Sequence, residues 1–215
     1  MHLIFGGTFD PVHNGHLRLA IELKERLGLT QVALVPCHIP PHRERPGADS
    51  SERLDLLKLA IYGEPGLVVD DRELVRDGQS FTADTLRQLR AELGEQKPLA
   101  MAVGTDAFAT FDRWQDWQQI PELAHIIVVN RPDSALAPES EPARLLMSRR
   151  ATEAGQLHLQ PAGLVLEVEL PQLSISATAI RSTIAQGQSP RYLLPDRVWD
   201  AIRSNSLYGA RSGEH

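Results

Sequence analysis

The chain has 215 residues and a formal net charge of −6, which allows one substantial α/β core and argues against a nucleic-acid partner. Its single cysteine, Cys37, excludes an internal disulfide and suits a reducing compartment. No apolar run approaches the ~20 residues that span a bilayer and no signal-peptide pattern opens the chain, so we expect a cytoplasmic protein that has no membrane partner.

The first predicted unit is a strand, a loop and a helix. The apolar run Leu3–Phe5 predicts a buried strand, and apolar residues recur at helical intervals over 16–27 until Gly28. Gly6 and Gly7 in the loop permit close backbone approaches that a Cβ would block. The chain therefore begins with a tight joint between a strand and a helix.

Polar residues gather at this joint. Asn14 can cap the helix, and the first backbone amides and the helix dipole then form a positive pole. His13 and His16 are three residues apart and can lie on the same side of the first turn. This combination predicts a polyphosphate site. A His-x-x-His pair can instead bind a metal, but no third Cys, His or carboxylate ligand has an obvious local spacing.

The second strand is predicted at 31–35, which makes the first unit βαβ with parallel strands. A proline-rich loop follows at 36–43, at the carboxyl end of a strand, where open α/β sheets bind ligands. His38 and Arg43 lie in this loop, and Arg43 can meet an anionic group there. The alternative is an ordinary surface loop.

The middle of the chain continues this alternation. Asp49 and Glu52 form a capping-box pattern that opens a helix, and 67–70 predicts a strand. Thr82 can cap a further helix that stops at Gly94. A buried strand at 98–103 leads directly into Gly104-Thr105-Asp106, which again places polar groups at the carboxyl end of a strand.

Trp114 lies in a segment, 111–123, that we expect to be helical and broken near Pro121. A tryptophan at helical spacing usually belongs to the core, but its position beside a candidate site loop also suggests stacking on a ligand ring. After a strand at 125–129, the stretch 131–160 is predicted to be an insertion or a mobile connection, with a surface helix over 144–154. We expect a single domain over 1–208 and a flexible tail over 209–215.

A second polar cluster follows the strand predicted at 164–170. Ser176 can cap a helix, and with Thr178 and the guanidinium of Arg181 it offers another phosphate site. Alone, this pattern is ordinary helix-start chemistry with a solvated arginine. A closing helix is predicted at 195–202.

Two of these motifs resemble a known family. The sequence His13-Asn14-Gly15-His16 looks like the His-x-Gly-His signature of the nucleotidyltransferases, and Ser176–Arg181 is similar to the Ser-x-Thr-x-Ile-Arg signature of bacterial adenylyltransferases. Further agreement lies in Pro40–Arg43, Phe81–Leu86, Gly104–Asp106 and the Trp114 segment. Together these motifs resemble the nicotinate-nucleotide adenylyltransferases of NAD synthesis over nearly the whole chain. The resemblance departs at His38, where relatives often have an amide residue.

The resemblance implies a Rossmann-like, doubly wound and mostly parallel sheet with helices on both faces. It also implies that ATP and nicotinate mononucleotide react to give deamido-NAD and pyrophosphate. No covalent intermediate forms, because the acceptor phosphate attacks the α-phosphorus directly. Mg²⁺ is expected to arrive on the ATP phosphates, with no dedicated protein ligands.

The expected site has three parts. The phosphates are held by the residues expected to act in catalysis: His13, His16 and Arg181. The ATP site adds two strand-end segments and the second signature: Gly6, Gly7, Thr8, Phe9, Gly104, Asp106, Ser176 and Thr178. The nicotinate mononucleotide site is formed by loop and helix-start residues and one aromatic ring: His38, Arg43, Thr82, Ala83, Asp84, Thr85 and Trp114.

Several alternatives stay open at this point. The acceptor can be nicotinamide mononucleotide or phosphopantetheine, although phosphopantetheine adenylyltransferases are typically shorter and lack this combination of later motifs. The chain can also be a nucleotide-binding protein that has lost catalysis, although His13, His16 and Arg181 are all present. The sequence does not indicate the oligomeric state.

Overall fold

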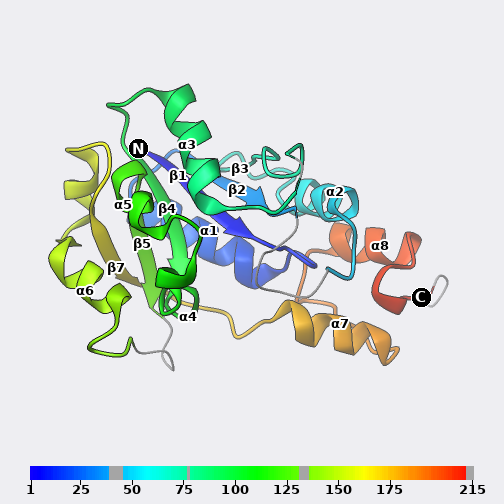
Figure 1. The fold of residues 1–215 in the computed structure, drawn as a ribbon. Helices are drawn as coiled ribbons and strands as arrows, with labels where there is room; N and C mark the ends of the chain where they lie inside the picture. Colours follow the sequence, from blue (N-terminus) through cyan, green and yellow to red (C-terminus); the bar gives the residue numbers. More distant parts are fainter. Residues whose placement is uncertain (39–45, 77, 131–135, 212–215) are drawn as a thin grey trace.

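A computed structural model describes the chain except residues 39–45, 77, 131–135 and 212–215. Its centre is a parallel sheet of seven strands in the order β3-β2-β1-β4-β5-β7-β6 (Figure 1). The strands are β1 (His2–Gly7), β2 (Val32–Pro36), β3 (Leu67–Val69), β4 (Leu99–Gly104), β5 (His125–Asn130), β6 (Arg150–Ala151) and β7 (Val165–Glu169).

Helices connect the strands and cover both faces of the sheet. The α-helices are α1 (Asn14–Arg26), α2 (Ser50–Ala60), α3 (Thr82–Leu93), α4 (Thr105–Phe108), α5 (Ile120–Leu123), α6 (Glu141–Ser148), α7 (Ala177–Ala185) and α8 (Asp196–Ser204). Short 3₁₀ helices are η1 (Phe111–Arg113), η2 (Trp117–Gln119), η3 (Ala154–His158) and η4 (Leu207–Gly209). The predicted Rossmann-like fold is therefore confirmed.

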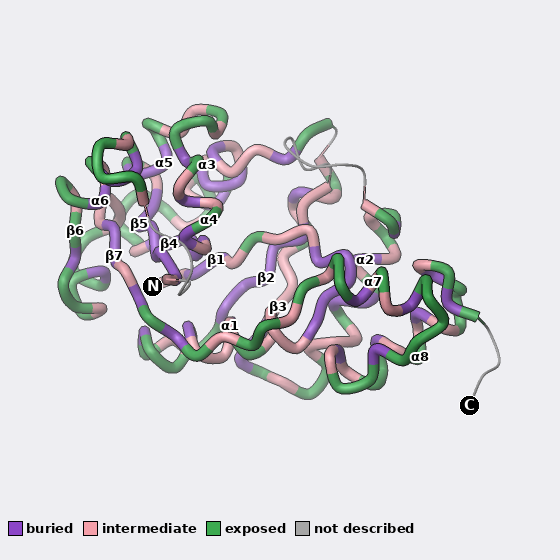
Figure 2. Tube along the Cα trace, turned by 90° about the horizontal axis from the view of Figure 1, so that it is seen from below, coloured by how far each residue is buried: buried purple, intermediate pink, exposed green. Residues whose placement is uncertain are grey.

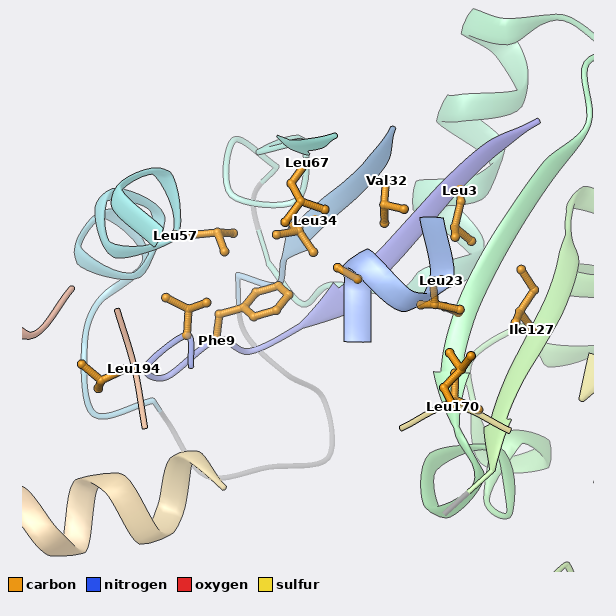
Figure 3. Packing of buried hydrophobic residues seen from close by; sticks show 14 of the residues in the cluster. Leu3, Phe9, Leu23, Val32, Leu34, Leu57, Leu67, Ile127, Leu170 and Leu194 are labelled. Atoms are coloured by element: carbon orange, nitrogen blue, oxygen red, sulfur yellow. The ribbon is translucent and has the colours of Figure 1, made fainter. Parts of the chain in front are cut away.

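The alternation of side chains along each strand creates two cores. Leu3 of β1 packs into one buried cluster with α1, α2, α7 and α8, whereas its neighbour Ile4 packs into the other with α3, α5 and α6. Successive side chains of a strand point to opposite faces, so a sheet covered on both faces needs continuous apolar strands. Buried residues accordingly follow the strands in Figure 2, and Figure 3 shows part of the first cluster, with Phe9 among its members.

The strand order reverses between β1 and β4, because β2 and β3 extend to one side of β1 while β5, β7 and β6 extend beyond β4. Such a reversal opens a crevice at the carboxyl ends of the two strands, since the connecting helices leave toward opposite faces. Both strand-end motifs expected to meet a nucleotide, at Gly6–Phe9 and at Gly104–Asp106, begin at this point.

Two predicted helix caps were wrong. The N-cap of α1 is His13, and the Asn14 side chain instead donates to the carbonyl of Tyr192 at 2.9 Å. The N-cap of α3 is Phe81, whose side chain makes no capping hydrogen bond, and Thr82 is the first residue inside the helix. In both cases the helix begins one residue earlier than the polar side chain predicted, because the backbone dihedral angles define the N-cap.

The predicted helix over 111–123 was also wrong. This segment consists of η1, η2 and the single turn α5, because Trp114 is extended and Asp116 has a positive φ of 53°. The surface helix expected over 144–154 lies earlier, as α6, and buries Pro142, Ala143 and Leu146. The strand β6 follows it and pairs with β7.

The expected division of the chain stays a prediction. Within the stretch proposed as an insertion or mobile connection, residues 136–160 contain α6, β6 and η3, while 131–135 lie outside the described residues. Of the proposed tail, 212–215 lie outside them as well. None of the helices in the described part of the chain has the length and apolar character needed to cross a bilayer.

The capping box at the start of α2 gives a stability prediction. The Asp49 carboxylate accepts from the Glu52 backbone N–H at 2.8 Å, and the Glu52 side chain accepts in return from the Asp49 N–H at 2.8 Å. We expect Asp49→Ala to lower the free energy of unfolding by about 1 kcal/mol in urea titrations, because an end amide loses its acceptor. The control is Ser51→Ala at an exposed position of the same turn, which should change it by less than ~0.5 kcal/mol. Equal losses in the two variants would contradict the capping role.

Candidate active site

The carboxyl ends of β1 and β4 place the two glycine motifs on the two sides of the strand reversal. β1 pairs with β4 as far as Phe5 and Ala102, and beyond this pair Gly7 is aligned with β2 while Gly104 is aligned with β5. After Gly7 the chain makes a tight turn, in which Phe9 has a positive φ of 50° and a buried side chain. A Cβ at Gly7 would lie 2.9 Å from the Phe9 ring, so this close approach needs glycine. Phe9 thus supplies a buried anchor, and only its backbone can face a nucleotide.

The two histidines of the first motif stack on each other at the start of α1. Their ring centroids are 3.6 Å apart with an interplanar angle of 23°, and the Phe9 ring meets His16 edge-on at 5.0 Å. The His16 Nδ1 accepts a hydrogen bond from the His13 backbone N–H at 3.3 Å. A neutral His16 with an accepting Nδ1 carries its proton on Nε2, which makes that atom a donor.

His13 is the more enclosed of the pair. It is 5% exposed, and its Nδ1 has no hydrogen-bond partner among the described residues. Burial lowers the pKa of His13 from 6.5 to about 4, because the charged ring loses its hydration. The free protein therefore holds a neutral His13 against the amides of the first turn of α1, which point at the crevice.

The second motif reaches the same place from the other end of the chain. Ser176 caps α7 by accepting from the Ala179 N–H at 3.1 Å, as predicted. From the first turn and a half of α7, Arg181 donates from Nη1 to the Asp10 carbonyl at 2.6 Å. This contact brings Arg181 to the turn that precedes His13, so the two signature motifs form one site. Thr178, one turn nearer the start of α7, is exposed.

A buried arginine supports the turn from behind. Arg53 of α2 has no exposed surface, and it donates to the Thr8 carbonyl at 2.7 Å and to the His38 carbonyl at 3.0 Å. His38 is fixed further by Ser50, whose Oγ lies 2.8 Å from its Nδ1, and by its backbone N–H, which donates to Ser80 Oγ at 2.9 Å. Through Arg53, the first residues of the loop after β2 are thus connected to the turn after β1. Arg43 of this loop lies outside the described residues.

The first turn of α3 lies across the second core from β1. The amides of Asp84 and Thr85 donate to the Phe81 carbonyl, at 3.1 and 3.3 Å, which leaves the Thr82 and Ala83 amides without an intrahelical acceptor. The Thr85 side chain is not available to a ligand. Its hydroxyl is buried and donates to the Glu73 carboxylate at 2.6 Å.

An ion-pair bridge joins α3 to the tryptophan segment. Arg87 donates to Asp84 and to Asp116, both at 2.6 Å. Trp114 is half-buried and packs against Phe111 with ring centroids 5.3 Å apart. Trp114 therefore packs partly against the second core and is partly exposed to solvent, which is compatible with stacking on a ligand ring.

The strand-end motif after β4 contributes a short helix. Gly104 is the N-cap of α4, and the buried Thr105 donates to the Val129 carbonyl at 3.1 Å. Asp106 follows in the first turn and is exposed. This places Asp106 just after the carboxyl end of β4, on the β4 side of the strand reversal.

Comparison with known proteins identifies the family. The sequence model of the family described as cytidylyltransferase-like matches residues 4–183. A protein of Marinobacter nauticus named "Probable nicotinate-nucleotide adenylyltransferase" is 59% identical over 214 residues, covering 100% of this chain and 99% of the relative. A protein of the same name from Cellvibrio japonicus is 47% identical, covering 95% and 97%. The chain belongs to the nicotinate-nucleotide adenylyltransferase family.

Solved structures agree on the fold. The structure described as "Plasmodium falciparum nicotinic acid mononucleotide adenylyltransferase complexed with NaAD" superimposes with a TM-score of 0.72 and covers 98% of both chains, at 16% sequence identity. At that identity the likeness shows the fold alone. It places this chain on the same α/β scaffold as an adenylyltransferase of another organism.

Within this family fold, the structure brings many of the predicted residues into two groups. The turn after β1, the histidine pair, Arg181 and the loop end at His38 are joined by hydrogen bonds or ring contacts. The residues at the start of α3 and Trp114 form a second group, joined by Arg87. Among the described residues no group of three His, Cys, Asp or Glu side chains could hold a metal ion.

Sequence reasoning missed three residues that organise the site. Asp10 stands inside the first motif but was given no role, Arg53 was overlooked on α2, and Tyr208 lies after the last motif. Arg53 had a signal, because it shares the spacing of Leu56 and Leu57 on the buried face of α2. An arginine at an apolar-face position indicates a buried cation with specific acceptors. Tyr208 had no such signal.

The low pKa of His13 gives a pH prediction. The unfolded chain binds a proton at this ring near pH 6.5, whereas the folded chain binds it only near pH 4. The free energy of unfolding is therefore unaffected by this ring above pH 6.5. It falls as the pH is lowered from 6.5 to about 4, by about 3 kcal/mol at most, because only the unfolded chain takes up the proton. We expect an NMR titration to place the His13 midpoint near 4. The variant His13→Gln should show a flatter decline of the unfolding free energy over this range. A midpoint near the ordinary value would contradict the buried, neutral ring.

Proposed function

We propose that the chain transfers the adenylyl group of ATP to nicotinate mononucleotide, giving deamido-NAD and pyrophosphate. The observation that carries this proposal is the meeting of two phosphate-binding motifs at one strand reversal. Arg181 of α7 donates to Asp10 of the turn that leads into the His13–His16 pair. A helix N-terminus, two imidazoles and a guanidinium around one crevice suit a triphosphate.

The reaction needs no nucleophile from the protein. A phosphate oxygen of the acceptor attacks the α-phosphorus of ATP and forms the new P–O bond. The bond between the α-phosphorus and the bridging oxygen breaks, and pyrophosphate leaves with the electron pair. The acceptor phosphate is already anionic at neutral pH, so catalysis consists of positioning and of stabilising charge on the phosphates. Mg²⁺ enters as part of the substrate, bound to the ATP phosphates.

The geometry suggests separate roles for the phosphate-binding residues. His16 can donate from Nε2, because its Nδ1 already accepts from the protein. Arg181 commits Nη1 to the Asp10 carbonyl and is still one-third exposed, so its other donors can face the phosphates. Gly6, Gly7 and Gly104 let the nucleotide approach the strand ends, and Asp106 is placed to meet a ribose.

The nicotinate ring is proposed to lie between Trp114 and the start of α3. The Thr82 and Ala83 amides, which lack intrahelical acceptors, can bind its carboxylate at a positive helix end. The buried Glu73 carboxyl lies below this turn, but burial raises its pKa, and Arg76 donates to the same Thr85 hydroxyl that Glu73 accepts from. The negative charge of Glu73 is thereby countered beneath the helix start.

Family membership favours this reaction over transfer to phosphopantetheine and over a non-catalytic role, since relatives covering almost the whole chain carry the nicotinate name. Nicotinamide mononucleotide is the acceptor closest in shape. Its amide would present NH₂ donors to the Thr82 and Ala83 amides and find no acceptor there, which costs ~1–3 kcal/mol. A cytoplasmic location stays a prediction.

The first test compares acceptors. Pyrophosphate release with MgATP should proceed with nicotinate mononucleotide at a kcat/KM roughly ten- to a hundredfold above that with nicotinamide mononucleotide, and phosphopantetheine should not react. Trp114→Ala should lower kcat/KM for both mononucleotides and leave their ratio almost unchanged, because ring stacking does not read the carboxylate. Equal kcat/KM values for the two mononucleotides in the parent protein would contradict recognition of the carboxylate by the start of α3. A collapsed ratio in the variant would assign the selection to Trp114.

The second test concerns His16. We expect His16→Ala to lower kcat by ~10²–10³, the scale for removing one preorganised donor from a developing charge, while ATP still binds. The measurement is steady-state pyrophosphate release together with calorimetric ATP binding. Full activity in a folded His16→Ala protein would exclude the proposed role.

A further inference from the structure

Four segments that are far apart in the sequence meet at the Asp10 carboxylate, which is 5% exposed. Its Oδ2 accepts from the Gly47 N–H at 2.8 Å, and its Oδ1 accepts from the Ala48 N–H at 3.1 Å and from the Tyr208 hydroxyl at 2.8 Å. The Arg181 Nη1 lies 3.5 Å from Oδ2 and donates to the Asp10 carbonyl. One buried carboxylate thus joins the first motif, the loop before α2, α7 and η4.

Tyr208 is the member that completes this cluster. A Cβ at Gly47 would lie 3.2 Å from the Tyr208 ring and 3.5 Å from Cδ of Arg181, so the ring, the arginine stem and the backbone at Gly47 are in contact. Burial, followed by the neighbouring Asp10, raises the pKa of the Tyr208 phenol. The hydroxyl is therefore a constant donor at working pH. Tyr208 also lies beyond residues 4–183, which the family model matches.

We propose that Tyr208 is a positioning residue for adenylyl transfer, acting through Asp10 to hold Arg181 toward the ATP phosphates. The inference rests on the proposed function, in which Arg181 binds those phosphates. Tyr208 touches no reacting atom. It contributes a neutral donor to a carboxylate that would otherwise seek its hydrogen bonds from the arginine.

The physical reason lies in how the donors around Asp10 are divided. With Tyr208 and two backbone amides bonded to it, the carboxylate has three neutral donors, and its ion pair with Arg181 is long, at 3.5 Å from Nη1 to Oδ2, while Nη1 donates to the Asp10 carbonyl. Without the hydroxyl, Oδ1 keeps a single neutral donor. The nearby guanidinium then becomes its strongest available partner, since charge-assisted bonds exceed neutral ones. Shortening the existing 3.5 Å ion pair into a direct hydrogen bond with Asp10 would turn the guanidinium fork away from the phosphates.

The variant that isolates this effect is Tyr208→Phe, because it removes only the hydroxyl. Tyr208 has a positive φ of 54°, and phenylalanine meets the same backbone constraint as tyrosine, so the substitution adds no backbone strain. We expect the calorimetric Kd for MgATP to rise about tenfold, the order produced by losing a hydrogen bond to a charged group, while the KM for nicotinate mononucleotide stays within about twofold. The control is Tyr62→Phe, a 70% exposed tyrosine just beyond the C-terminal end of α2, which should leave both values unchanged.

A double-mutant cycle then tests whether Tyr208 acts through Arg181. In an Arg181→Lys background, which lacks the guanidinium fork, Tyr208→Phe should change the Kd for MgATP by less than about twofold, because interacting residues are not additive. A full tenfold loss in that background would overturn the proposal. So would an unchanged Kd in the single variant, or equal losses for both substrates accompanied by a lower melting temperature, which would assign Tyr208 a purely structural role.

Binding and turnover separate this inference from the proposed function. The MgATP titration is made without an acceptor, so it reports the Tyr208 effect even if the acceptor were another molecule. Failure of the parent protein to release pyrophosphate with nicotinate mononucleotide would instead refute the proposed function and leave the Kd comparison intact.

Discussion

The site depends on how the backbone of one turn is held. The Thr8 carbonyl accepts from Arg53 of α2 at 2.7 Å, and the Asp10 carbonyl accepts from Arg181 of α7 at 2.6 Å. Between them, the buried Phe9 fixes the turn to the core with a positive φ. A guanidinium bonded to a carbonyl keeps its positive charge, so both contacts shape the turn and place a cation beside it. Helices from distant parts of the sequence therefore have to be in place before the phosphate site exists.

This arrangement explains how an acidic chain can bind a polyanion. The net charge of −6 is spread over the whole sequence, whereas the cations and helix ends that matter are gathered at the strand reversal. Arg53 is the extreme case, because it is fully buried and donates to two carbonyls and to the Ser50 hydroxyl. Its guanidinium holds the Thr8 and His38 carbonyls in place.

The acceptor half of the site is built by different means. Its ligand-facing groups are proposed to be backbone amides at the start of α3, and the side chains around them are engaged with each other. Thr85 bonds to Glu73, and Asp84 and Asp116 share Arg87. These contacts fix where the helix begins relative to Trp114. Recognition of a planar ring and its carboxylate then depends on the geometry of the backbone, which a rigid set of ion pairs and hydrogen bonds can maintain.

The sequence by itself determined the strand and helix alternation, the capping box at Asp49, the Ser176 cap and the two phosphate motifs, because each is a local pattern of apolar spacing or of polar groups within one turn. It could not place the caps of α1 and α3, or the breaks around Trp114 and Asp116, since backbone dihedrals there are set by packing. Only the tertiary structure decided that Asp10, Arg53, Arg181 and Tyr208 act on the same turn. Their contacts join residues up to 198 positions apart, and no local spacing encodes such a meeting. This meeting follows from the pairing of β1 with β4 and from the packing of α2, α7 and α8 on one face of the sheet.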